Sequence, residues 1–195
     1  MKRLHWIGAA TLGLAMATQA ATIEFSAVLL GETEDPPVTT DGHGTAHVIY
    51  DDTAHTLSVH VEFEDLTGTT TVAHIHAPTP DPFSGNASVA TYPSTFPGFP
   101  SGVQSGVYDG VWSLTEASSY TTGFLSAHGD SPEAAEQGLL QALLDGRAYV
   151  NIHSSFQPSG EIRGFLRRVP DGGSTGLLLG LGLLGMLGAR RYARA

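Results

Sequence analysis

The sequence predicts an all-β fold, and three observations support the prediction. Seven short segments alternate apolar and polar residues, as strands with one buried face do. Turn-forming residues separate these segments, and only one stretch has the spacing and end signals of a helix. Short antiparallel strands with one late helix indicate a Greek-key sandwich or a Greek-key barrel.

Length and composition limit the architecture and the partners. A chain of 195 residues is typical of one domain. Its 19 acidic residues outnumber its 9 basic ones, which argues against nucleic acid as a partner. The chain has no Cys, so disulfides, thiolate metal sites and a Cys nucleophile are excluded. It has nine His, and we expect its chemistry there.

The first 21 residues predict a signal peptide. Lys2 and Arg3 give a basic start, an apolar run follows, and the small residues Ala20 and Ala21 suit a cleavage site. A short buried helix is the alternative. The mature domain is then expected in residues 22–168. This span contains 18 acidic residues and four Arg, so its net charge is −14.

The remaining residues, 169–195, form a three-part tail. It opens with the turn-forming residues Val169, Pro170, Asp171, Gly172 and Gly173. Residues 176–189 carry no charge, and three Arg follow them. The apolar run is shorter than the roughly 20 residues of a comfortable membrane span, but flanking arginines can snorkel. We therefore predict that residues 176–189 form a short transmembrane helix. The arginines that follow it are expected on the cytoplasmic side of the membrane.

This tail resembles the VPDSG class of the PEP-CTERM sorting signals found in exported bacterial proteins. Val169, Pro170 and Asp171 fit the motif, and Gly172 stands where that class usually has Ser. The resemblance implies recognition by an exosortase-type protease, removal of the tail, and delivery to the cell surface or extracellular matrix of a Gram-negative bacterium. A plain single-span membrane anchor is the alternative.

The strand segments follow one another with clear turns. The clearest strand is 56–63, in which Leu57 and Val59 share one face with the later apolar residues. Pro, Gly, Ser and aromatic residues make 81–106 a long loop region. The predicted strands cover residues 23–29, 45–50, 56–63, 71–76, 107–114, 148–154 and 161–167.

One helix is predicted before the last two strands. Ser131 caps its start, Pro132 suits its first position, and Gly146 follows its end. Glu133 and Glu136 favour the positive end of the helix dipole. The apolar face consists of Leu139, Leu140, Leu143 and Leu144.

Three segments are specific when taken together. They read Ala-His-Ile-His-Ala-Pro at 73–78, Ala-Tyr-Val-Asn-Ile-His-Ser at 148–154 and Ser-Gly-Glu-Ile-Arg-Gly at 159–164. In this order, with a helix before the second segment, they resemble the CHRD domain, which is named for its occurrence in chordin and is common in exported bacterial proteins.

The likeness covers about residues 23–166. It departs from the family pattern at Ala77, where Gly is common, and in a Pro- and Phe-rich insertion at 92–100. The resemblance implies an immunoglobulin-like or related Greek-key β-sandwich. It implies little about activity.

Three histidines in these segments are candidate metal ligands. His74 and His76 are two residues apart on a strand, so their side chains leave the same face. His153 is the natural third ligand, because it shares one face of its own strand with Tyr149 and Asn151. Neutral imidazole suits copper or zinc, so these residues predict a copper or zinc site.

Two alternatives stay open for these histidines. In the first they are structural and hydrogen-bond Asn151, Glu161 or backbone carbonyls, while Arg163 pairs with Glu161 or a neighbouring carboxylate. In the second, the His-x-His strand and the distant His are similar to Cu/Zn superoxide dismutase. That similarity implies a copper-dependent redox enzyme in which Arg163 guides an anion.

The other histidines are less specific. His47 and His60 are expected to meet across a hairpin, as a second, weaker site or as solvated surface residues. His43 lies close before His47, His55 follows a turn, and His128 lies in a loop. The sequence as a whole indicates an exported binding or structural module, with a matrix protein or a polysaccharide as its expected partner.

Overall fold

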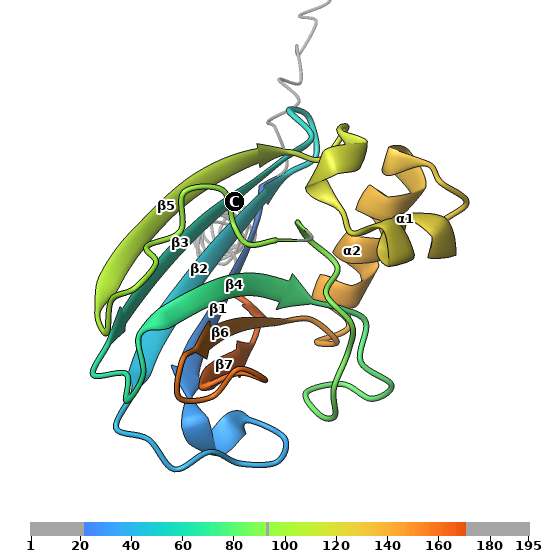
Figure 1. Ribbon diagram of the computed structural model, residues 1–195. Coiled ribbons are helices and arrows are strands. Elements are labelled where there is room, and N and C mark those ends of the chain that lie inside the picture. Colours follow the sequence, from blue (N-terminus) through green and yellow to red (C-terminus); the bar gives the residue numbers. More distant parts are fainter. Residues whose placement is uncertain (1–21, 93, 171–195) are drawn as a thin grey trace, which may run out of the picture.

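The computed structural model describes residues 22–92 and 94–170, which form one curled antiparallel sheet with two helices beside one end (Figure 1). The predicted signal peptide lies outside the described residues. So do the predicted transmembrane helix and all of the sorting tail beyond Pro170. Within the described ranges, no helix is long and apolar enough to span a membrane.

The strands form where the alternation of apolar and polar residues predicts them. Their bounds are β1 (Thr22–Leu30), β2 (His43–Asp51), β3 (Thr56–Glu64), β4 (Thr70–His76), β5 (Gly106–Ser113), β6 (Tyr149–Ser154), β7 (Ile162–Phe165) and β8 (Arg167–Arg168). Apolar side chains of each long strand face the inside of the curl and make one contiguous core. The all-β, antiparallel prediction is confirmed.

The prediction of a two-sheet sandwich is corrected, because all the strands belong to one hydrogen-bonded sheet. The order is β4-β6-β7-β1-β2-β3-β5, and β8 pairs with β1. β1 pairs with β2 over its whole length and, on its other edge, pairs with β7 at Leu30–Arg163 and with β8 at Ser26–Arg167. The hydrogen-bonded strands therefore form one continuous sheet, and the twist of the strands curls this sheet around the core. A curled sheet and a sandwich have the same alternation, so the pattern cannot separate them.

Within the described residues, two helices lie beside the sheet, next to the C-terminal end of β4, where the sequence predicts one (Figure 1). α2 (Pro132–Leu144) begins as predicted, because the Ser131 hydroxyl accepts a hydrogen bond from the Ala134 N–H. α1 (Thr122–Ala127) has only six residues and too few turns for an apolar period. Two short 3-10 turns, Gly31–Thr33 and Ala117–Ser119, complete the elements.

Glu136, predicted to favour the start of the helix, also has partners on the sheet. Its side chain is buried and accepts hydrogen bonds from the Tyr50 hydroxyl at 2.8 Å and from His55 Nδ1 at 3.0 Å. The carboxylate thus ties α2 to the β2–β3 hairpin. The sheet, both helices and the core all lie within residues 22–170, so this span is the unit for experiments.

Candidate metal centre

The site begins with the pairing of β4 and β6, whose two faces are both buried. Ala73, Ile75, Val150 and Ile152 belong to the core on one face. The register places His74 opposite Asn151 and His76 opposite Tyr149, so the polar side chains share the other face. Two segments cover this second face: the long loop after β4 and the turn at 157–160.

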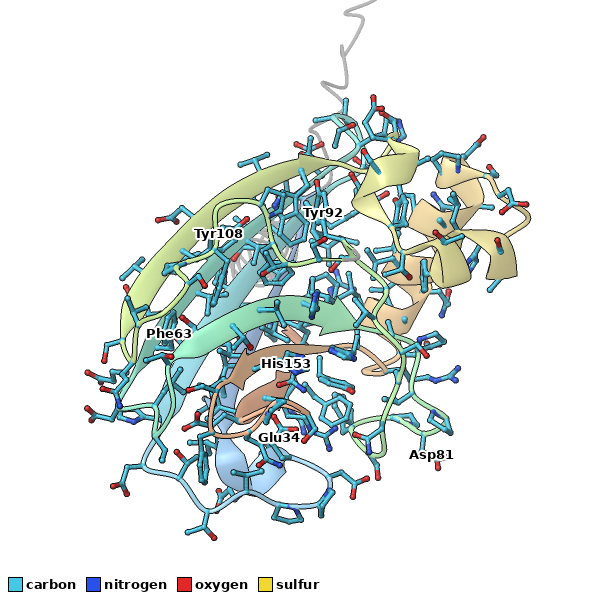
Figure 2. All side chains as sticks on the ribbon, in the orientation of Figure 1. Glu34, Phe63, Asp81, Tyr92, Tyr108 and His153 are labelled. Carbon is cyan, nitrogen blue, oxygen red and sulfur yellow. The ribbon has the colours of Figure 1, made fainter. Side chains whose placement is uncertain are left out.

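The register brings His74, His76 and His153 together as one cluster, which we call the buried triad. The ring centroids are 5.9 Å apart for His74–His76, 5.5 Å for His74–His153 and 5.7 Å for His76–His153. The three residues are only 5 to 8% exposed. Figure 2 shows His153 among side chains between β4 and the loop that carries Glu34.

Each ring of the buried triad donates one hydrogen bond to a backbone carbonyl. His74 Nε2 lies 3.2 Å from the Ser94 oxygen, His76 Nδ1 lies 2.9 Å from the Ala87 oxygen, and His153 Nδ1 lies 3.0 Å from the Pro158 oxygen. A carbonyl only accepts, so these nitrogens carry the protons of the neutral rings. The carbonyls therefore fix the tautomer and the orientation of all three rings.

The other nitrogen of each ring has no partner. His74 Nδ1, His76 Nε2 and His153 Nε2 are buried without a hydrogen bond. One ring nitrogen from each residue lies within 4.8 Å of those of the other two. Ligand nitrogens of a tetrahedral zinc ion are roughly 3.4 Å apart at Zn–N distances of about 2.0–2.1 Å, so only small ring movements are needed.

Burial keeps the buried triad neutral, which is the form that binds a metal. Removal from water lowers the pKa of His74 to about 4 and that of His76 to about 4, and it also lowers the pKa of His153. The cluster contains no carboxylate. It therefore offers three neutral nitrogen ligands, a set that suits zinc or copper rather than calcium or magnesium.

Tyr149 supports the position of His76. The two rings stack with centroids 4.9 Å apart and planes 8° from parallel. The guanidinium of Arg163 lies over the same tyrosine ring, 4.7 Å from its centroid. The Tyr149 hydroxyl also contacts the backbone of Ala87, whose carbonyl accepts from His76.

Arg163 and Glu161 do not pair with each other. The carboxylate nearest to Arg163 is Glu34, with 3.7 Å between Nε and Oε2. Glu161 is fully buried and accepts hydrogen bonds from Thr40, Ser154 and the backbone N–H groups of residues 67 and 68. Both residues thus hold loops against the sheet beside the triad.

The other histidines that the structure describes lie away from the buried triad. His47 and His60 pair directly across β2 and β3, as expected, but each contacts a carboxylate on the outer face. His43 forms an exposed group with Glu64 and Asp65. His128 donates to the carbonyl of residue 124 within the helical region.

Four features of the site have no signal in the sequence. These are the carbonyls of Ser94, Ala87 and Pro158 that fix the rings, and the position of Glu34. All of them lie on loops, whose paths follow no apolar period. Only the stacking of Tyr149 on His76 follows from strand register.

Comparison with known proteins gives two matches. The sequence profile of the CHRD domain matches residues 25–166, and the chain belongs to this family. The profile of the VPDSG-CTERM motif matches residues 168–191, which confirms the predicted class of the tail despite Gly172. The motif implies an exported cell-surface protein processed by an exosortase-type system. No curated protein and no solved structure matches the chain.

Proposed function

We propose that this CHRD domain protein is a metal-holding binding or structural module, displayed at the cell surface or in the matrix of a Gram-negative bacterium. His74, His76 and His153 bind one copper or zinc ion. The observation that carries the proposal is the buried set of three unpartnered ring nitrogens. A purely structural histidine has no reason to leave a buried nitrogen unpaired, because that costs about 1–3 kcal/mol.

The geometry favours a held metal over a redox enzyme. The anion-guiding role expected of Arg163 needs a free guanidinium, but Arg163 is 3% exposed. Its Nε donates to the Thr33 carbonyl, and its Nη1 donates to the Gly85 carbonyl and to Asn86 Oδ1. The Arg163 guanidinium therefore holds loops in place and is not free to guide an anion.

Metal analysis of purified residues 22–170 tests the proposal. After titration with zinc or copper and removal of the excess, the parent is expected to retain one equivalent. The His74→Ala/His76→Ala variant is expected to retain none. His128→Ala is the matched control and keeps one equivalent, because His128 lies outside the triad.

Retention of less than a tenth of an equivalent by the parent would contradict the proposal and favour the structural interpretation. A circular dichroism spectrum of each variant shows whether it is folded. If the double variant does not fold, His153→Gln supplies the same comparison with a smaller change. Superoxide turnover by the copper-loaded parent would favour the redox enzyme instead.

A further inference from the structure

A second group of buried polar atoms lies beside the buried triad and has no role in it. Glu34 Oε1 and Asn151 Oδ1 are buried and have no hydrogen-bond partner. Glu34 is 7% exposed and follows β1, while Asn151 is 2% exposed and lies in the middle of β6. Two acceptors from distant parts of the chain are thus left unpaired, although native structures pair nearly all such atoms.

Both residues line one cavity of about 280 Å³. Its wall also includes His76, Tyr149, Asn86 and Ser159, together with Pro36 and Val38. One water molecule takes up about 30 Å³ in the liquid, so the space exceeds what a single water or metal ion fills.

Glycine at position 160 lets Asn151 and Glu34 approach the backbone closely. A Cβ there would lie 2.5 Å from Asn151 Nδ2 and 2.8 Å from Glu34 Oε1, closer than real contacts allow. The φ angle of Gly160 is +129°, which L side chains rarely adopt. The Asn151 amide and the Glu34 carboxyl therefore meet at a backbone position that carries no side chain.

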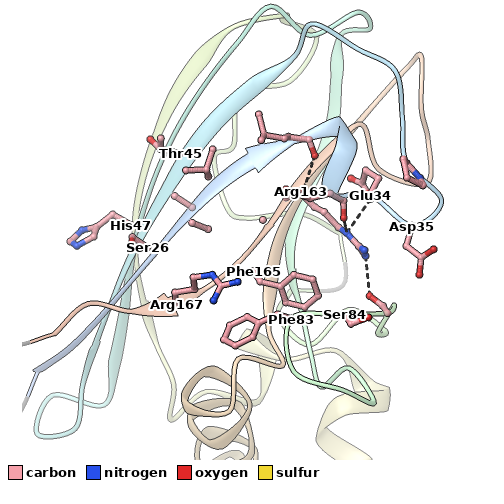
Figure 3. A pocket seen from close by; sticks show the side chains of 18 residues that line it. Ser26, Glu34, Asp35, Thr45, His47, Phe83, Ser84, Arg163, Phe165 and Arg167 are labelled. Atoms are coloured by element: carbon pink, nitrogen blue, oxygen red, sulfur yellow. Dashed lines mark hydrogen bonds and ion pairs between the residues drawn. The ribbon is translucent and has the colours of Figure 1, made fainter.

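Arg163 does not satisfy Glu34, although the two are neighbours (Figure 3). The 3.7 Å contact of Arg163 Nε reaches Oε2 only, and the Nε and Nη1 donors go to other oxygens. Oε1, on the same carboxyl, remains free. Burial outweighs the charge of Arg163 and raises the pKa of Glu34 to about 7, as expected for a carboxyl short of donors.

His76 also lines the wall, and its unpaired Nε2 belongs to the buried triad, whereas three other polar side chains there already have partners. Asn86 Nδ2 donates to the Asp35 carbonyl, and Asn86 Oδ1 accepts from Arg163. The Ser159 hydroxyl accepts from Gln157, and the Tyr149 hydroxyl contacts Ala87. The cavity thus presents the unused acceptors Glu34 Oε1 and Asn151 Oδ1.

We propose that this cavity binds a small primary amine in its ammonium form, with Glu34 Oε1 and Asn151 Oδ1 accepting its N–H groups. An ammonium supplies three donors for these acceptors and a positive charge for the Glu34 carboxylate. Pro36, Val38 and the Tyr149 ring provide apolar surface for a short alkyl chain. The site needs no metal, so it stands independently of the buried triad.

Nuclear magnetic resonance titration of chelator-treated residues 22–170 tests the proposal with three probes. Propylammonium is expected to cause saturable shifts at the amides of residues 34–38 and 159–160. Propan-1-ol has the same chain without the charge, and tetramethylammonium has the charge without N–H donors. Both are expected to bind at least tenfold more weakly.

Glu34→Gln is expected to weaken propylammonium binding at least tenfold, because it removes the charge and keeps the shape. Glu32→Gln is the matched control, since Glu32 is exposed two residues away. Equal binding of propylammonium and propan-1-ol would overturn the proposal. So would no saturable binding, which means a cavity filled by water only. The three probes compared on the parent protein decide the question even if a variant fails to fold.

Discussion

Two groups of three histidines in this protein have opposite surroundings. In the buried triad, each ring is 5 to 8% exposed and donates to a carbonyl. His43, His47 and His60, which we call the outer row, have side chains 40 to 45% exposed and contact carboxylates. The pKa of His74 falls to about 4, whereas hydrogen bonds and nearby carboxylates raise the pKa of His43 and His60.

The difference shows that burial and the partner decide what a histidine does. Burial keeps the ring neutral, and a carbonyl that accepts from one ring nitrogen leaves the second nitrogen free to bind a metal. A carboxylate partner instead favours the protonated ring, which cannot bind one. The same residue type thus forms a candidate ligand set on one face of the sheet and contacts with carboxylates on another.

The largest contrast in stability is expected between a carboxylate beside the buried triad and one that contacts the outer row. Glu161→Gln is expected to lower the free energy of unfolding by about 3 kcal/mol, because the carboxylate accepts four hydrogen bonds in the interior. Glu62→Gln is expected to change it by less than about 1 kcal/mol, since Glu62 is exposed. Urea unfolding measures both.

The pH dependence of the Glu161 effect has a definite sign. Burial by itself raises the pKa of Glu161, but hydrogen bonds from Ser154, Thr40 and two backbone N–H groups outweigh it and hold the pKa below 4.5. The carboxylate therefore contributes stability above pH 4.5 that is lost as the pH falls through its folded pKa. An equal loss of unfolding free energy in Glu161→Gln and Glu62→Gln at pH 7 would contradict this explanation.

A smaller contrast is expected in how much zinc raises the unfolding temperature of variants of the two histidine groups. At a free concentration 100 times its dissociation constant, a bound ion stabilises the folded state by about 2.7 kcal/mol. This corresponds to a rise of roughly 5–10 °C in the unfolding temperature of a domain of this size. The His47→Ala/His60→Ala variant is expected to keep the rise and His74→Ala/His76→Ala to lose it. A rise that depends on His47 and His60 would place the ion on the wrong face.

The smallest effect is expected in the outer row. His60 contacts Asp109 at 2.7 Å and Glu62 at 3.3 Å. Its raised pKa means that these pairs contribute stability below pH 6.5, which is lost as the pH rises through the folded value. The contribution is under about 1 kcal/mol. Asp109→Asn is expected to return the His60 pKa toward 6.5 in a magnetic resonance titration, and an unchanged pKa would refute the assignment.

Part of the site was predictable because side chains two residues apart on a strand share a face. His74 and His76 had to share a face, and the β4–β6 register joined His153 to them. The loop carbonyls that orient the rings were not predictable, because loops have no period to interpret. Nor was the buried state of Glu136, since its position near the helix start suits the dipole equally well.

The fold was likewise predictable only in part. Alternation located every long strand, because it reports which face of a strand is buried. It does not report whether the ladder is continuous, so the single sheet joined through β1 differs from the expected sandwich. The short helix α1 was missed because six residues make fewer than two turns.

X-ray absorption spectroscopy of zinc-loaded residues 22–170 tests the central claim most directly, because it identifies the atoms bound to the metal. Three imidazole nitrogens are expected at about 2.0–2.1 Å from the zinc. This signal is expected to be lost in the His74→Ala/His76→Ala variant and retained in the His47→Ala/His60→Ala variant. Carboxylate oxygens in place of imidazoles, or a signal that persists without His74 and His76, would contradict the claim.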